Sequence, residues 1–171
     1  MKKSLIVGFK FLAVVLISFV WIKSLILDAK VKEIFVKNEV SQEELLAAIN
    51  SWPNAKTTEL IAVRISAADP DCLILDNFGK RIIEIDSRYA QGWHIDAICR
   101  NLKGDFTGAV NSINEAVKLD PLNPNYLILK VKLEISAGKK DSAFATLKEI
   151  EENYPDNPEI TILNTSISAM P

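Results

Sequence analysis

The stretch GDFTGAVNSINEAVKLDPLNP, residues 104–124, has a counterpart 34 residues later in GKKDSAFATLKEIEENYPDNP, residues 138–158. Five positions are identical at that offset: Gly104 and Gly138, Ala109 and Ala143, Pro121 and Pro155, Asn123 and Asn157, and Pro124 and Pro158. A fixed period of this size is typical of stacked helical hairpins. One hairpin cannot bury its apolar face alone, so neighbours must pack together and leave a curved surface exposed. The period therefore predicts an all-α fold.

Glycines and prolines divide the repeat into helices. The first helix of each pair is expected from about Tyr89 to Leu102 and from Leu127 to Ala137, and each ends at a glycine turn. The second helices carry apolar stripes, namely Ala109, Ile113, Ala116 and Val117, and then Ala143, Leu147 and Ile150. Each Asn-Pro pair is expected to cap a following helix, with proline at its first position. A last helix from about Pro158 would cover the end of the stack with its apolar members Ile160, Leu163 and Ile167.

These residues resemble the tetratricopeptide repeat family, which sets a large residue in the first helix, small residues where helices cross, and a proline at the end. The residues that fit this pattern are Trp93, Ala97, Gly104, Ala109, Ile113, Ala116 and Pro121, and then Leu127, Val131, Gly138, Ala143, Leu147 and Pro155. The match covers about residues 88–156, and a degenerate repeat at 56–87 extends it. The resemblance implies a right-handed solenoid of stacked antiparallel hairpins, with two clear repeats and one degenerate repeat, in a domain of residues 55–171.

The chain departs from the family pattern at two positions in each repeat. Asp96 and Lys130 stand where an apolar residue is usual, and Arg100 and Glu134 replace an expected aromatic. These departures predict helix faces that are slightly rotated from the family's packing. A weaker likeness, carried by AINSWPN at residues 48–54, is to the repeat-bearing tail of bacterial O-antigen ligase and polymerase relatives. Those enzymes carry many membrane spans, whereas this chain predicts one.

Residues 1–27 predict a transmembrane anchor. They contain no acidic residue, and Ser4 to Leu27 would form a helix of about 36 Å, enough to cross a hydrocarbon core of about 30 Å. The alternatives are a cleaved signal peptide and a buried soluble helix. Cleavage is disfavoured because the best site, after Ala29, has Leu27 where a small residue is needed. A short N-terminal tail favours an N-terminus inside the cytoplasm and a C-terminal domain outside it.

Residues 28–54 predict an amphipathic linker and a short helix, which Ser41 and Glu44 begin as a capping box. Beyond residue 27 the chain carries 16 basic side chains against all 22 acidic ones. An acidic body repels phosphate backbones, so no nucleic-acid partner is expected. The oligomeric state is not predicted.

The sequence predicts no catalytic or metal-binding site. His94 is the single histidine and has no cysteine or acidic pair at metal-ligand spacing, so no metal, cofactor or catalytic residue is expected. Cys72 and Cys99 lie outside any metal-binding spacing. The favoured interpretation is two small buried hydrophobes. A disulfide between them is the alternative if the domain lies outside the cytoplasm.

In the resembled family, the first helix of each repeat lines a concave groove that binds a protein or peptide. Carried over by position, the groove residues are Gln91, His94, Ile98, Asn101, Asn125, Ile128, Lys132 and Ile135. The resemblance implies a membrane-anchored scaffold or adaptor in envelope assembly, without enzymatic activity. The alternative is an accessory protein or detached tail of a polysaccharide ligase or polymerase system. A further alternative is that these side chains face solvent and bind no partner.

Overall fold

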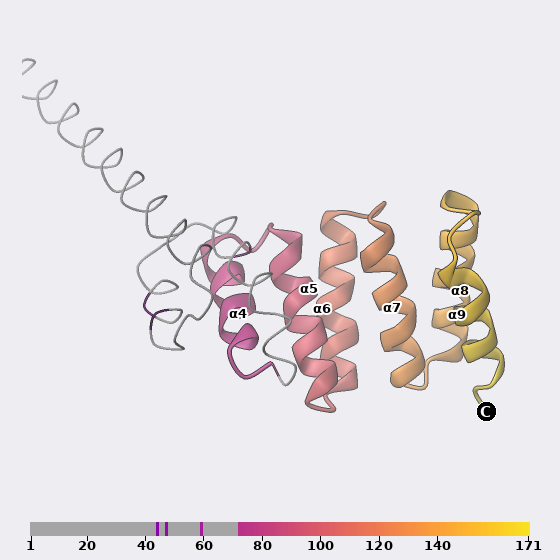
Figure 1. Cartoon of the computed structure of the whole chain (residues 1–171), viewed down its shortest axis with the longest axis horizontal. Helices are drawn as coiled ribbons and strands as arrows, with labels where there is room; N and C mark the ends of the chain where they lie inside the picture. Colours follow the sequence, from indigo (N-terminus) through magenta and orange to yellow (C-terminus); the bar gives the residue numbers. More distant parts are fainter. Residues whose placement is uncertain (1–43, 45–46, 48–58, 60–71) are drawn as a thin grey trace, which may run out of the picture. The chain divides into compact units, whose positions relative to one another are not determined.

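The computed structural model describes residues 72–171 together with the single positions Glu44, Ala47 and Glu59 (Figure 1). The predicted anchor at 1–27 and nearly all of the predicted linker lie outside the described residues. Residues 72–171 form six α-helices and no strand, which confirms an all-α fold for this part of the chain. The helices are α4 (Leu75–Ile85), α5 (Ala90–Leu102), α6 (Phe106–Leu119), α7 (Pro124–Ser136), α8 (Lys140–Asn153) and α9 (Glu159–Ser168).

Successive helices pack as antiparallel neighbours (Figure 1), most extensively α5 with α6, followed by α4 with α5 and by α7 with α8. The helix pairs α5–α6 and α7–α8 are the two hairpins of the 34-residue repeat. The turns inside these two pairs are built alike. Gly104 has φ +79° and Gly138 has φ +70°, left-handed values that favour glycine because it has no Cβ. After each glycine the next backbone N–H bonds back into the helix, from Asp105 to Arg100 and from Lys139 to Glu134. The repeated glycines are therefore helix-ending turns, as predicted.

Asparagine opens both α7 and α9. The Asn123 side chain accepts a hydrogen bond from the Asn125 backbone at 3.1 Å, and Pro124 is the first residue of α7. The Asn157 side chain accepts from the Glu159 backbone at 2.9 Å. Helix α7 begins three residues before the expected Leu127, and α9 begins one residue after the expected Pro158. The capping prediction is confirmed at Asn123. At α9 the cap residue is Pro158, which was expected to be the first helical residue, although the Asn157 side chain still bonds the Glu159 backbone.

The cores follow the apolar stripes of the second helices. Ala109 and Ala143 are fully buried, each in its own cluster where helices approach closely. Leu163 and Ile167 of α9 join the α7–α8 cluster, and Ile160 packs against it. The last helix therefore covers the end of this cluster, as the apolar pattern predicted.

Helices α4 and α5 approach each other through glycines. A Cβ on Gly79 would lie 2.8 Å from the Ile95 Cγ2, and a Cβ on Gly92 would lie 2.8 Å from the Ile82 Cγ2. A disulfide adds a covalent link at this contact. The interpretation of Cys72 and Cys99 as separate buried thiols was wrong, because the two residues are bonded with a Cα–Cα distance of 5.4 Å. Spacing alone could not reveal this pair, since the hairpin stack brings the two residues together.

Candidate functional site

The eight predicted groove residues lie along two helices, four on α5 and four on α7. The 34-residue offset makes each α5 position the counterpart of one on α7, so that Gln91 matches Asn125 and His94 matches Ile128. The same offset reaches α9 at Glu159, Ile162 and Ser166, which sequence analysis did not include. We call these eleven positions the row face. Its identity as a binding groove stays a prediction.

A tyrosine joins the α5 and α7 parts of the row face. The Tyr126 hydroxyl donates a hydrogen bond to the Gln91 side-chain oxygen at 3.0 Å. The His94 ring lies with its centroid 5.0 Å from that of Tyr126, tilted by 40°. Burial lowers the pKa of His94 to about 4, so the imidazole is neutral at neutral pH. Sequence analysis missed Tyr126 because the family positions it used do not include this residue.

Accessibility changes along the row face. His94 Nδ1 and Asn101 Oδ1 are both buried and have no hydrogen-bond partner among the described residues. Asn125 and Lys132 on α7 are exposed, as is Ile162 on α9. The Lys132 ammonium lies 2.8 Å from the Glu159 carboxylate, which links α7 to α9. The fully exposed row-face residues therefore lie on α7 and α9, whereas the four α5 residues are partly buried.

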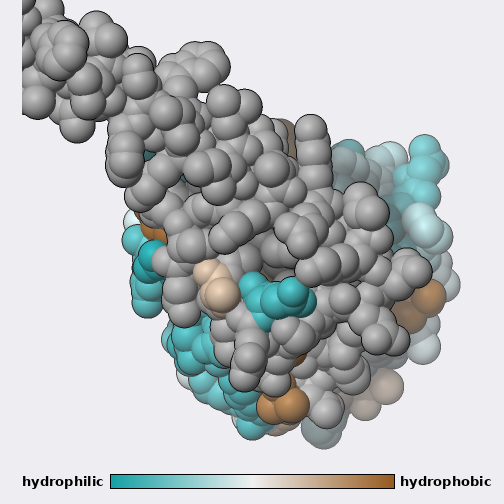
Figure 2. Space-filling model, turned by 60° about the vertical axis from the view of Figure 1, so that its left-hand side comes forward, coloured by the Kyte–Doolittle hydropathy of each residue, from teal (hydrophilic) through white to brown (hydrophobic). Residues whose placement is uncertain are grey.

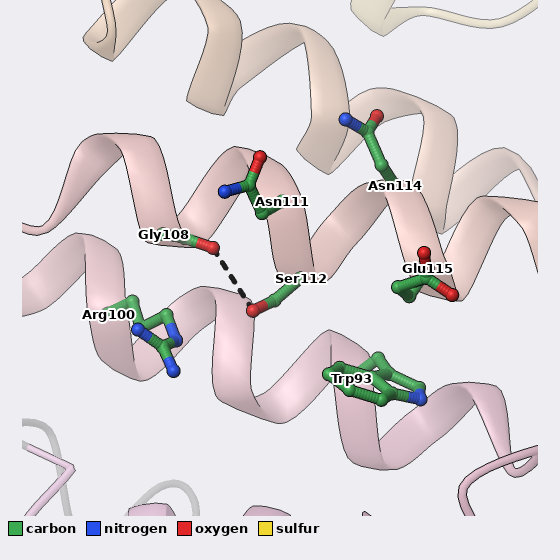
Figure 3. A pocket seen from close by; sticks show the side chains of 7 residues that line it. All are labelled: Trp93, Arg100, Gly108, Asn111, Ser112, Asn114 and Glu115. Carbon is green, nitrogen blue, oxygen red and sulfur yellow. Dashed lines mark hydrogen bonds between the residues drawn. The ribbon is translucent and has the colours of Figure 1, made fainter.

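A second feature is a cavity of about 440 Å³ between α5 and α6. Figure 3 shows Trp93 and Arg100 on α5 and the other labelled residues on α6, with the Asn111 and Asn114 amides at the rim farthest from α5. The lining residues are Trp93, Arg100, Gly108, Asn111, Ser112, Asn114 and Glu115. Sequence analysis did not predict this cavity.

Two residues that line the cavity, Arg100 and Ser112, belong to a polar network with Asp96. The Asp96 carboxylate is buried and accepts hydrogen bonds from the Arg100 guanidinium at 2.6 Å and from the Ser112 hydroxyl. Arg100 also donates to Asp105 at 2.8 Å. Hydrogen bonds from the Gly108 backbone and from Arg100 hold the pKa of Asp105 below its usual value. The charged residues that depart from the family pattern are therefore paired inside the hairpin.

The exposed large apolar side chains of residues 72–171 are spread along the chain, at Leu73, Leu102, Phe106, Leu119, Leu122, Phe144 and Ile162. On the face shown in Figure 2, hydrophobic residues of the described part show as separate spots among hydrophilic ones. Scattered apolar residues are normal on a folded protein and do not by themselves mark an interface.

Within the described residues, no three potential metal-ligating side chains gather at one place. None of the helices in residues 72–171 is long and apolar enough to cross a membrane, and the span predicted at 1–27 lies outside the residues described. A comparison with protein-family models and with curated proteins finds no match.

Proposed function

We propose that the chain is a membrane-anchored, tetratricopeptide-like adaptor that binds a protein or peptide on its row face. The observation that carries this proposal is the 34-residue correspondence of side chains along α5, α7 and α9, with Asn125, Lys132 and Ile162 exposed. Regularly repeated side chains on one face suit an extended polypeptide, whose own groups recur at regular intervals. The mixture of amides, a lysine and isoleucines could contact both polar and apolar groups of such a partner.

The proposed location is the extracytoplasmic side of a bacterial-type envelope, with residues 1–27 as the anchor. The Cys72–Cys99 disulfide supports this placement, because disulfides persist in oxidising compartments and are rare in the cytosol. The apolar N-terminal run supports the anchor. The partner would then belong to an assembly on the same side of the membrane.

The test is capture of partners from native membranes by row-face variants. Replacing Asn125 and Lys132 together by alanine should weaken capture, because both side chains are exposed on the row face. The melting temperature should change little, since the Lys132–Glu159 pair is at the surface and worth about 0–1 kcal/mol.

The matched control replaces Lys118 and Lys148, exposed lysines of α6 and α8, by alanine. Capture by this control should equal that by the wild-type protein. Equal capture by the row-face variant would move the binding site elsewhere, first to the charged segment between Lys30 and Val40.

A further inference from the structure

We propose that the cavity between α5 and α6 binds a neutral saccharide unit. The cavity is distinct from the row face, and this inference does not depend on the adaptor proposal. Its volume, about 440 Å³, falls within the range of roughly 300 to 1,000 Å³ that is usual for small-molecule sites.

Several residues that line the cavity differ from their counterparts in the α7–α8 hairpin. A Cβ on Gly108 would lie 2.1 Å from an oxygen of Asp105 and 2.8 Å from the Arg100 guanidinium, so only glycine leaves this arrangement undisturbed. The α8 counterpart of Gly108 is Ser142. The lining at Gly108 is therefore not a feature of the repeat.

The aromatic wall is also specific to this hairpin. Trp93 is only partly buried, whereas its counterpart Leu127 is fully buried in the α7–α8 core. The Trp93 indole N–H donates to the Ser87 carbonyl at 2.8 Å, which satisfies its one polar group. The ring thus presents apolar surface at the cavity, as needed to pack against the C–H face of a sugar.

The rim supplies groups that pair with hydroxyls. Asn111 and Asn114 are exposed, and their amides make no hydrogen bond within the described protein. Each amide offers both a donor and an acceptor, which matches a hydroxyl group. Their counterparts in α8 are Ala145 and Lys148, so the second hairpin lacks both amides.

The charges in and around the cavity disfavour an anion. Arg100 is already held by Asp96 and Asp105, at 2.6 and 2.8 Å. The carboxylate of Glu115 lies 3.4 Å from the Lys118 ammonium, so this neighbouring cation is paired as well. Among the described lining residues, Arg100 is the one cation. A phosphate or uronic acid would lack a counter-charge, whereas a neutral polyhydroxylated ligand requires none.

The experiment titrates saccharides onto the full chain in lipid nanodiscs, because glycosidic detergents would compete for the cavity. Trp21→Phe and Trp52→Phe leave Trp93 as the one tryptophan among the chain's three, so its emission reports on the cavity. The neutral probes are cellobiose, lactose and diacetylchitobiose, and the anionic comparator is digalacturonate. We expect a saturable emission change with at least one neutral disaccharide, and binding of digalacturonate at least about tenfold weaker.

In that background, Asn111→Ala with Asn114→Ala should weaken binding about tenfold or more, because two hydrogen-bonding amides are lost. Glu115→Ala is a second cavity variant with the same expected direction. The row-face double change at Asn125 and Lys132 is the matched control and should leave saccharide binding unchanged.

Three results would overturn the proposal. One is no saturable change with any neutral probe up to about 10 mM, and another is equal binding of digalacturonate. The third is unchanged affinity in both cavity variants. A photo-cross-linker at Asn114 that captures a polypeptide, with no competition by sugars, would assign the cavity to a protein ligand instead. Loss of partner capture by the row-face variant alone would leave the saccharide site standing.

Discussion

The α5–α6 and α7–α8 hairpins each hold an ion pair on their first helix, but the acidic and basic residues come in opposite order. In the first, the acid comes before the base, as Asp96 pairs with Arg100 one turn later. In the second, Lys130 precedes Glu134, with 3.7 Å between the charged groups. Each hairpin nevertheless buries its carboxylate and keeps its base more exposed.

The hydroxyl partners of the two carboxylates occupy matched repeat positions. Ser112 donates to Asp96, and Thr146, 34 residues further on, donates to Glu134 at 2.9 Å. The second helix of each hairpin thus places a hydroxyl at the same repeat position. The carboxylate on the first helix that accepts from this hydroxyl can stand at either of two positions one turn apart. The comparison teaches that the repeat fixes where a polar contact lies, while the order of the charges can vary.

The largest difference between the hairpins is covalent. Only α5 carries a disulfide, which closes a separation of 27 residues between Cys72 and Cys99. Replacing both cysteines by serine should lower the free energy of unfolding by about 3 to 4 kcal/mol. Native-state hydrogen exchange should then locate the loss in α4 and α5. Equal loss of protection in α7 to α9 would show that the described stack unfolds as one unit and that the hairpins are not separable.

The second prediction concerns the more tightly bonded carboxylate. Asp96→Asn should cost about 2 to 3 kcal/mol in thermal or urea unfolding, because a charge-assisted bond to Arg100 is lost inside the protein. Arg100 would keep its contact with Asp105, so the fold should persist. A cost under about 0.5 kcal/mol would mean that Asp96 is more hydrated than its burial indicates.

The third prediction concerns the matched carboxylate. Burial raises the pKa of Glu134 above its ordinary value of 4.5. The folded protein therefore binds this proton more tightly than the unfolded chain. Its contribution to the free energy of unfolding is greatest below the unfolded pKa and is lost as pH rises through the folded pKa.

Glu134→Gln removes this titration while keeping the shape of the side chain. We expect a cost of less than about 1 kcal/mol at pH 7, since the weaker Lys130 contact is offset by easier burial of an amide. The wild-type protein should gain stability relative to the variant as pH falls from 7 toward the ordinary pKa of 4.5. Urea melts across this range measure the difference, and a gain in the opposite direction would reverse the sign of the assigned shift.

The smallest expected effect lies at the start of the second helices. The Asp105 side chain caps α6 by accepting from the Gly108 backbone at 2.9 Å, while Lys139 at the matched position of α8 makes no side-chain cap. Lys139→Asn should therefore stabilise the protein by about 0.5 to 1 kcal/mol. Lys148→Asn, in the middle of α8, is the control and should slightly destabilise it. If both changes lower the melting temperature, the two helix starts are not equivalent.

Sequence analysis predicted the features that depend on local backbone chemistry. The turns at Gly104 and Gly138, the Asn123 cap and the buried Ala109 follow from φ values, capping and side-chain size, and the 34-residue repeat makes these positions visible in the sequence. Helix ends were misplaced by up to three residues at Pro124, because an Asn-Pro cap and the apolar stripe mark different points.

Contacts that depend on three-dimensional neighbours were not predictable from one sequence. The partner of Cys99 lies in the segment before α4, and the hydroxyl bonded to Asp96 and the tyrosine beside His94 lie on other helices. The buried carboxylates at the charged departures pair with a base and a hydroxyl, which sequence analysis did not predict. The expected rotation of the helix faces stays a prediction. The cavity was not predicted because Trp93 also fits a core position in the pattern of the resembled family. Its spacing does not distinguish a residue that lines a cavity from one that packs in the core.

Site-specific photo-cross-linking in native membranes tests the adaptor proposal most directly. A photoreactive residue at Lys132, exposed on the row face, is compared with the same residue at Lys118 on α6. The adaptor proposal predicts one dominant protein adduct from position 132 and none from position 118. Equal adducts from both positions, or adducts only from probes placed in residues 30–40, would contradict it.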